Sequence, residues 1–327
     1  MPVSRVLLIP ALFCVKLSGL SETEKQTVSV IGGTSPLGID LVRRLAGDGI
    51  NIAASYRDHS RFANAFGERD SVVGVSLDLT QPFVSNKLYC ETVIWLAHVG
   101  QGRFNSEEVA ANLAALDAFL ISPEIRLVEK FIFVSSGGSV YGPPEKLPIT
   151  ESQKLAPLSS YGKAKAAMEQ RLAKFSAESG IDLAILRPGN IYGFSDPNND
   201  VKGIIAAVID AIKHDKKFPL IHAGKTVRDY IHVDDVINAI VTAADNKAKN
   251  ITWNVATGVG TSVIDIIKEI TRSSGQKLEN IEYIKNYASD VEANILSISR
   301  VKKESDWRPT ISLADGISQI VATSFGK

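Results

Sequence analysis

The sequence predicts an α/β protein built on a doubly wound parallel sheet, and three observations support this prediction. Short apolar segments rich in β-branched residues alternate with helical segments from residue 27 onward. The expected strands are apolar almost throughout, which is typical of a parallel sheet covered by helices on both faces. The first strand ends in Gly32-Gly33, directly before a helical segment.

The expected elements follow one another without an internal repeat. A helix with Leu37, Leu41 and Leu45 on one face follows the first strand and ends near Gly47. After Gly193 the alternation loosens, and we expect a smaller C-terminal α/β lobe there. The predicted strands are residues 27–31, 50–54, 72–77, 93–97, 130–134 and 183–186, and further helices are predicted at residues 106–121 and 160–179.

The N-terminus carries a short apolar segment, residues 6–15, behind Arg5. This segment is too short to span a bilayer, which takes about 20 apolar residues. It is similar to the hydrophobic part of a signal peptide within residues 1–20; the alternative is an extension ahead of the first strand. We therefore treat residues 1–26 as a leader of uncertain status.

Composition and charge exclude several classes of protein. The 36 Lys and Arg balance the 36 Asp and Glu, so the zero net charge argues against a nucleic-acid-binding face. With 45% hydrophobic and 22% charged residues, the chain is not of the disordered class. Two cysteines cannot form a disulfide framework, which fits a reducing, cytoplasmic location. The histidines show no zinc-like spacing, and we expect neither a metal site nor a membrane partner.

The turn after the first strand predicts a site for a dinucleotide pyrophosphate. Glycine permits a sharp turn, and the following helix offers unpaired N–H groups and a partial positive charge to phosphate. Ser35 replaces the middle glycine of a Gly-x-x-Gly-x-x-Gly pattern, and its hydroxyl can donate to phosphate. The expected cofactor-binding residues here are Gly32, Thr34, Ser35, Pro36, Leu37 and Gly38.

The end of the second strand discriminates between NAD and NADP. An acidic residue there would bind the adenosine ribose and repel a 2′-phosphate. This sequence has Ser55-Tyr56-Arg57 before its first acid, Asp58. Because Arg57 can pair with a phosphate or stack on adenine, Tyr56 and Arg57 favour NADP over NAD. The alternative is a surface loop in which Arg57 faces water.

Tyr161 and Lys165 form the candidate catalytic pair. They lie four residues apart, on one face of the predicted helix 160–179. An ammonium beside a phenol lowers the phenol pKa from about 10 toward neutrality. Such a tyrosine can take a proton from an alcohol, or return one to a carbonyl, while hydride moves to or from nicotinamide. The alternative is an exposed pair on a helix surface.

These motifs together resemble the extended short-chain dehydrogenase/reductase family, in particular its nucleotide-sugar 4-epimerases, dehydratases and 4-ketoreductases. The resemblance covers about residues 26–309, and its most specific segment is VRDYIHVDD at residues 227–235. It implies a Rossmann-type NAD(P)-binding domain over residues 27–194, with some later elements returning to it. Residues 195–327 would mainly form the substrate lobe, and the protein would be a homodimer.

The resemblance also implies roles for single residues. It assigns Asn190 and Arg228 to the nucleotide-sugar substrate, with Arg228 at the diphosphate. Tyr141 is a further candidate for the substrate site, and the alternative is an ordinary buried aromatic. Gly137 stands where the family has the Ser or Thr that holds the reacting oxygen, so either Ser136 or Ser139 replaces it or this contact is absent. The remaining cofactor positions that it implies are Asp78, Leu79, Ala97, Asn112 and Pro188, besides Tyr161 and Lys165.

The functional expectation is an NAD(P)-dependent enzyme acting on carbon 4 of a nucleotide-activated sugar. As a 4-epimerase it would oxidise the hydroxyl, rotate the keto sugar and return the hydride to the other face. The alternative is an NADPH-dependent 4-ketoreductase of a nucleotide 4-keto-6-deoxy sugar, which Tyr56 and Arg57 favour. A non-catalytic dinucleotide sensor is the alternative from another class, and it would need neither Tyr161 nor Arg228.

Overall fold

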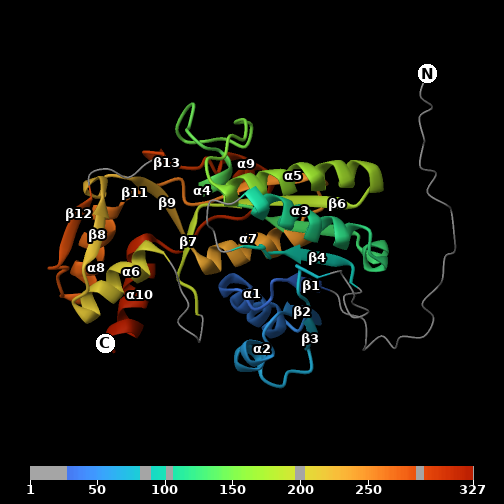
Figure 1. Cartoon of the computed structure of the whole chain (residues 1–327), viewed down its shortest axis with the longest axis horizontal. Helices are drawn as coiled ribbons and strands as arrows, with labels where there is room; N and C mark the ends of the chain where they lie inside the picture. Colours follow the sequence, from blue (N-terminus) through green and yellow to red (C-terminus); the bar gives the residue numbers. More distant parts are fainter. Residues whose placement is uncertain (1–27, 82–89, 101–105, 196–202, 285–290, 327) are drawn as a thin grey trace.

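The centre of the molecule is a seven-stranded parallel sheet (Figure 1). The computed structural model describes residues 28–81, 90–100, 106–195, 203–284 and 291–326, so the predicted leader lies outside the described residues. In the order β3-β2-β1-β4-β5-β6-β10, the strands are Val72–Ser76, Ile52–Tyr56, Val28–Ile31, Thr92–Trp95, Lys130–Val134, Asp182–Pro188 and Ile251–Val255. The predicted fold class is confirmed, and the six predicted strands lie close to their expected bounds.

Helices cover both faces of this sheet (Figure 1). On one face, α1 (Pro36–Gly47), α2 (His59–Phe66) and α7 (Val233–Asp245) share an apolar core with the sheet. On the other, α3 (Ser106–Leu120) and α5 (Ser160–Ser179) share a second core. Because successive strand residues point to opposite faces, β1 sends Val30 into the first core and Ile31 into the second. This double burial explains why the strands are apolar throughout.

A smaller group of elements lies beside the large sheet (Figure 1). Helices α6 (Ile204–His214), α8 (Val263–Ser274) and α10 (Leu313–Phe325) share a third apolar core. The strands of this group are β7 (Asn190–Tyr192), β8 (Phe218–Ile221), β9 (Val227–His232), β11 (Gly260–Ser262), β12 (Ile281–Ile284) and β13 (Ala293–Asn294). Because α7 and β10 pack with the large sheet, the chain passes from the large sheet to the smaller group and back again. The predicted boundary between two lobes at residue 194 stays a prediction.

Short elements complete the described part of the chain. They are α4 (Gly137–Val140), α9 (Ser299–Glu304) and the 3-10 turns η2 (Pro123–Leu127) and η3 (His222–Gly224). None of the helices in the described ranges is both long and apolar enough to cross a membrane.

The winding of the sheet reverses between β1 and β4. Open α/β sheets bind ligands at such a switch point, outside the carboxyl ends of the strands. Gly32 follows β1 with φ +92°, and a Cβ on it would lie 2.9 Å from the Ala97 nitrogen that follows β4. A Cβ on Gly38 would lie 2.2 Å from the Gly32 carbonyl oxygen. Glycine at both positions therefore lets β1, β4 and α1 converge at the switch point.

The acidic residues of the 227–235 segment anchor the scaffold. Asp229, fully buried, accepts hydrogen bonds from the backbone N–H groups of Thr257 (2.9 Å) and Gly258 (2.9 Å). Asp235, equally buried, accepts from the Thr310 N–H (2.9 Å), and its carbonyl accepts from the Trp307 indole (2.9 Å). The segment thus binds two loops that are distant in sequence, at residues 257–258 and 307–310.

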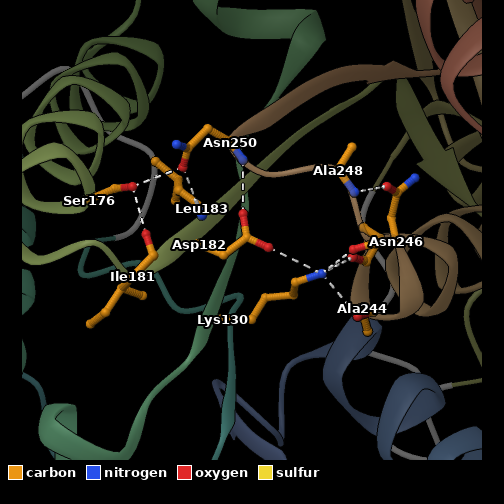
Figure 2. Close-up of polar contacts among 10 residues, drawn as sticks. Lys130, Ser176, Ile181, Asp182, Leu183, Ala244, Asn246, Ala248 and Asn250 are labelled. Carbon is orange, nitrogen blue, oxygen red and sulfur yellow. Dashed lines mark hydrogen bonds and ion pairs between the residues drawn. The ribbon is translucent and has the colours of Figure 1, made fainter.

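At the opposite, amino-terminal edge of the sheet, Lys130 joins β5 to the end of α7 (Figure 2). Its Nζ donates to the carbonyl oxygens of Ala243 (3.1 Å), Ala244 (3.1 Å) and Asn246 (2.6 Å). It also lies 3.3 Å from Asp182 Oδ2 at the start of β6. These carbonyls have no partner within their own helix, so one ammonium satisfies the carboxyl end of α7 and holds it against the sheet.

We predict that Lys130→Met lowers the free energy of unfolding by about 1–3 kcal/mol, because several half-buried acceptors lose their donor. Chemical denaturation monitored by circular dichroism measures this change. Lys247→Met, at an exposed lysine nearby, is the matched control and should leave stability within about 0.5 kcal/mol. Equal stability of the two variants would show that Lys130 does not hold α7.

Candidate active site

The turn at residues 32–38, called the glycine turn below, has the shape expected of a phosphate site. Ser35 contributes to this turn as the N-cap of α1. Ser35 caps α1: its Oγ accepts from the Gly38 N–H (3.1 Å) and donates to the Gly32 carbonyl (2.7 Å). In this structure the hydroxyl proton is directed to the Gly32 carbonyl, so its donation to a phosphate stays a prediction. Leu37 is buried in the core, and only its backbone can face a ligand. The close-packed glycines and the helix start still fit a dinucleotide pyrophosphate.

The end of β2 is tied to this turn by a residue that sequence reasoning did not select. Ser55, buried, accepts a hydrogen bond on Oγ from the Gly32 N–H at 2.8 Å. A small hydroxyl residue at the end of an otherwise apolar strand was the available signal. Ser55 thereby fixes the position of Tyr56 and Arg57 relative to the turn.

Basic residues line the rim beyond β2. Asp58, the first acid after the strand, accepts from the Ser60 N–H at 2.8 Å and caps α2. Arg61, one turn into α2, donates to the Thr34 carbonyl at 2.8 Å, so a second guanidinium reaches the glycine turn. Arg57 is exposed, and its charge helps the hydrogen bonds from Thr80 to lower the pKa of Asp78. The rim therefore brings together Arg57, Arg61 and Asp78.

Tyr56 and Leu79, the other predicted contacts in this region, are half-buried. The Tyr56 ring packs against the Phe62 ring of α2, with centroids 5.0 Å apart. Leu79 packs against the core beneath α3 and α5. Both residues shape the rim by packing.

Ser136 and Tyr161 form the polar centre of the candidate site. The Ser136 side chain, which follows β5, lies close enough to the Tyr161 phenol to oppose the rise in its pKa. Gly137 cannot carry a hydroxyl side chain here, because its Cβ would lie 2.9 Å from the Arg187 carbonyl oxygen and 2.5 Å from a Leu296 methyl. Of the two candidate serines, Ser136 is the one whose side chain acts on the pKa of Tyr161. Ser139 lies on α4 with its carbonyl against Gly162 of α5.

Lys165 lies one turn after Tyr161 and points beneath the end of β5. Its Nζ donates to the Val134 carbonyl at 2.9 Å and lies 5.8 Å from the centre of the Tyr161 ring. Burial raises the pKa of Tyr161 to about 12, against the Ser136 hydrogen bond, and lowers that of Lys165 to about 8. The predicted lowering of the tyrosine pKa by Lys165 is therefore wrong for this geometry, because desolvation dominates.

Tyr141 does not line the site, contrary to the prediction. It is fully buried, and its hydroxyl donates to Asn254 Oδ1 (2.7 Å) and accepts from Arg187 Nη1 (2.9 Å). Arg187, the first residue of RPGNIYG, also forms a buried ion pair with Glu169 of α5, with 2.6 Å between Nη2 and Oε2. Tyr141 is therefore a structural residue that supports the catalytic helix.

Asn112 and Pro188 are also structural in this geometry. The Asn112 side chain, buried, accepts from the Val99 N–H (2.9 Å) and donates to the Val99 carbonyl (2.7 Å). Its second amide proton goes to the Glu108 carbonyl at 2.7 Å, so the side chain holds the loop after β4. Pro188 is buried at the end of β6, against Gly137. Ala97 lies beside Gly32, as described above.

A cavity of about 810 Å³ opens between β7, β9, α6 and α10. Tyr230 and His232 of β9 line it, and Arg228 lies on the same face of that strand by alternation. The charge of Arg228 acts on Tyr230, whose pKa burial raises to about 12. Asn190 lines the cavity and also lies near Gly138, two residues after Ser136. A Cβ on Gly138 would lie 3.1 Å from Asn190 Oδ1. Asn190 thus connects the cavity with the catalytic serine.

Within the described ranges, no group of three or more His, Cys, Asp or Glu side chains could hold a metal ion.

Comparisons with known proteins agree with this geometry. The model of the NAD dependent epimerase/dehydratase family matches residues 28–256. UDP-glucose 4-epimerase of Mycolicibacterium smegmatis is 32% identical over 59% of this chain and 62% of its own length. For dTDP-4-dehydro-6-deoxyglucose reductase of Escherichia coli the identity is 30%, over 59% and 60%. The chain thus spans about three fifths of the length of these curated relatives.

A solved structure matches over a greater length. The UDP-glucose 4-epimerase of Thermotoga maritima, crystallised with UDP-glucose, superposes with a TM-score of 0.79 at 25% identity. The match covers 92% of this chain and 99% of that one. The likeness therefore includes the smaller group of elements as well as the large sheet.

We predict that Tyr141→Phe lowers the free energy of unfolding by about 1–2 kcal/mol, because Arg187 and Asn254 lose a buried partner. The KM for the sugar substrate should not change, since Tyr141 does not reach the cavity. Denaturant unfolding and steady-state kinetics of the same preparation measure both. A raised KM with wild-type stability would contradict this placement of Tyr141.

Proposed function

The chain belongs to the NAD dependent epimerase/dehydratase family, and on this basis we propose that it is an NAD(P)-dependent enzyme acting on a nucleotide-activated sugar, most like a sugar 4-epimerase. The observation that carries this proposal is that the Ser136 side chain lies close enough to Tyr161, at the carboxyl end of β5, to act on the pKa of its phenol. Lys165 lies one turn further along α5, and the glycine turn lies at the neighbouring switch point. Alcohol–ketone interconversion needs this combination of an acid/base and a dinucleotide site.

Each residue has a separate task in the proposed reaction. A bound dinucleotide supplies the hydride acceptor and donor. The deprotonated Tyr161 oxygen takes the proton of the carbon-4 hydroxyl, and the Ser136 hydroxyl holds the same sugar oxygen. The return step needs a protonated phenol, and the raised pKa of Tyr161 favours that form. The Lys165 ammonium, held by the Val134 carbonyl, supplies positive charge beside the phenolate.

The substrate side of the proposal rests on the cavity beside β9. Its volume is sufficient for a nucleoside, and Asn190 lies between it and the catalytic serine. Arg228 adds a guanidinium on the same strand face, which suits a diphosphate. The Thermotoga maritima relative, crystallised with UDP-glucose, supports a sugar nucleotide as the ligand class.

The rim beyond β2 favours a second candidate function. Asp58 caps α2, so the acid that would repel a 2′-phosphate is engaged in the scaffold. Arg61 reaches the turn, and Arg57 is exposed at the end of β2. A rim of this kind suits NADP, and a net 4-ketoreductase would use NADPH. One relative, from Escherichia coli, is named dTDP-4-dehydro-6-deoxyglucose reductase, which is a 4-ketoreductase name. A homodimer joined through α3 and α5 stays a prediction for either activity.

We predict that Tyr161→Phe lowers turnover by about 10²–10⁴-fold, because the variant has no group to exchange the sugar proton. Dinucleotide affinity, measured by fluorescence titration, should stay near the wild-type value. Ser136→Ala should also reduce turnover, whereas Ser139→Ala is the matched control and should retain it. Substantial activity in Tyr161→Phe would contradict the proposed mechanism.

We predict that Arg57→Ala raises the Kd for NADP by about tenfold and that for NAD by much less, because a charge-assisted bond to the 2′-phosphate is lost. Calorimetric titration with both dinucleotides measures the two changes. Arg126→Ala, at an exposed arginine of η2, serves as the control. If the two dinucleotides weaken equally, the rim does not read the 2′-phosphate, and the NAD-recycling epimerase is favoured.

A further inference from the structure

His98 lies between the glycine turn and the catalytic tyrosine. It follows Ala97, which a Cβ on Gly32 would touch, at the carboxyl end of β4. Its ring meets the Tyr161 ring edge-on, with centroids 4.8 Å apart and planes at 71°. Any ligand that lies at the switch point and reaches Tyr161 must therefore pass close to this imidazole.

A buried carboxylate fixes the orientation of that ring. Glu108 Oε1, on α3, lies 2.5 Å from His98 Nε2. Glu108 Oε2 accepts from the Ser160 hydroxyl at 2.8 Å, and Ser160 directly precedes Tyr161. Asn112, one turn further along α3, binds both backbone groups of Val99. The ring and its backbone are thus held from α3, and the same carboxylate is bonded to the start of the catalytic helix.

The Glu108 contact determines which histidine nitrogen is the acceptor. A carboxylate accepts, so Nε2 carries the proton and Nδ1 keeps a free lone pair. Burial and the charge of Lys165 lower the pKa of His98, against Glu108, and this favours the neutral ring. Nδ1 is buried and has no hydrogen-bond partner in the described part of the chain. An unpaired buried acceptor costs free energy, so a donor from outside the protein would be bound favourably.

We propose that His98 is a ligand-binding residue of this site, whose Nδ1 accepts a hydrogen bond from a neutral donor of a bound reactant. A phosphate or a keto oxygen cannot serve, because each is an acceptor. The donor is therefore a hydroxyl or carboxamide of the nicotinamide nucleoside, or a hydroxyl of the sugar. This inference rests on the proposed function, because it takes the dinucleotide and the sugar nucleotide as the ligands.

The test is His98→Ala, assayed for both ligands. If the donor belongs to the dinucleotide, the Kd for NAD and NADP rises about tenfold in a titration without sugar. If it belongs to the sugar, those Kd values stay constant, and the KM for the sugar nucleotide rises by a similar factor at saturating dinucleotide. His222→Asn is the matched control, because His222 is exposed and its φ of +50° suits asparagine. If both quantities stay within about twofold of wild type, the inference is overturned.

Two further variants separate binding from folding. Glu108→Gln can donate to Nε2 and move the ring proton to Nδ1, so we expect the same ligand to weaken as in His98→Ala. His98→Asn places an acceptor near the Nδ1 position and should recover part of the lost affinity. An Asn variant that melts like wild type but binds no better than His98→Ala would contradict the acceptor role.

The proposed function fails in a different way. A wild-type protein that binds no dinucleotide, or a Tyr161→Phe variant that keeps its turnover, would refute the function. If the wild-type protein is active and the His98 variants bind both ligands as tightly as wild type, the proposed function stands. That result refutes only the inference about His98.

Discussion

The buried ion pair between Arg187 and Glu169 is the contact on which the geometry of the candidate site depends. It joins the end of β6 to α5, with 2.6 Å between Nη2 and Oε2. Glu169 lies one turn after Lys165, so this pair sets the position of the helix that carries Tyr161. Removing one partner of such a pair leaves an uncompensated buried charge, at a cost of about 3–5 kcal/mol. The same guanidinium also donates to the Tyr141 hydroxyl. This bond joins the segment from Ser136 to Tyr141 to α5 in one hydrogen-bond network.

Local patterns were sufficient to predict the large sheet, the glycine turn and the Tyr161–Lys165 helix. Each of these depends on residues close in sequence, whether through the period of apolar residues or through the conformational freedom of glycine. The choice between Ser136 and Ser139 could not be made in this way. This choice depends on which serine side chain lies close to Tyr161, and the lack of space at Gly137 depends on the Arg187 carbonyl. Only the packed structure shows these contacts.

Two physical effects limited the prediction of the site from sequence. Tyr141 and the Ser35 hydroxyl were expected to face ligands, but each forms hydrogen bonds within the scaffold, and a sequence does not show which polar groups are already satisfied. The pKa of Tyr161 was misjudged because burial, rather than the spacing to Lys165, dominates it. Arg61 and His98 were missed for the converse reason, since their partners come from other elements.

In the proposed function, Tyr161 and Ser136 serve reversible hydride chemistry at carbon 4 of a sugar nucleotide. The most direct test is to incubate the protein with a UDP-hexose deuterated at carbon 4 and to follow the product by NMR and mass spectrometry. We predict a product with inverted configuration that retains its deuterium at carbon 4, without exchange into solvent. Loss of the deuterium to water, or inversion at another carbon, would contradict the claim.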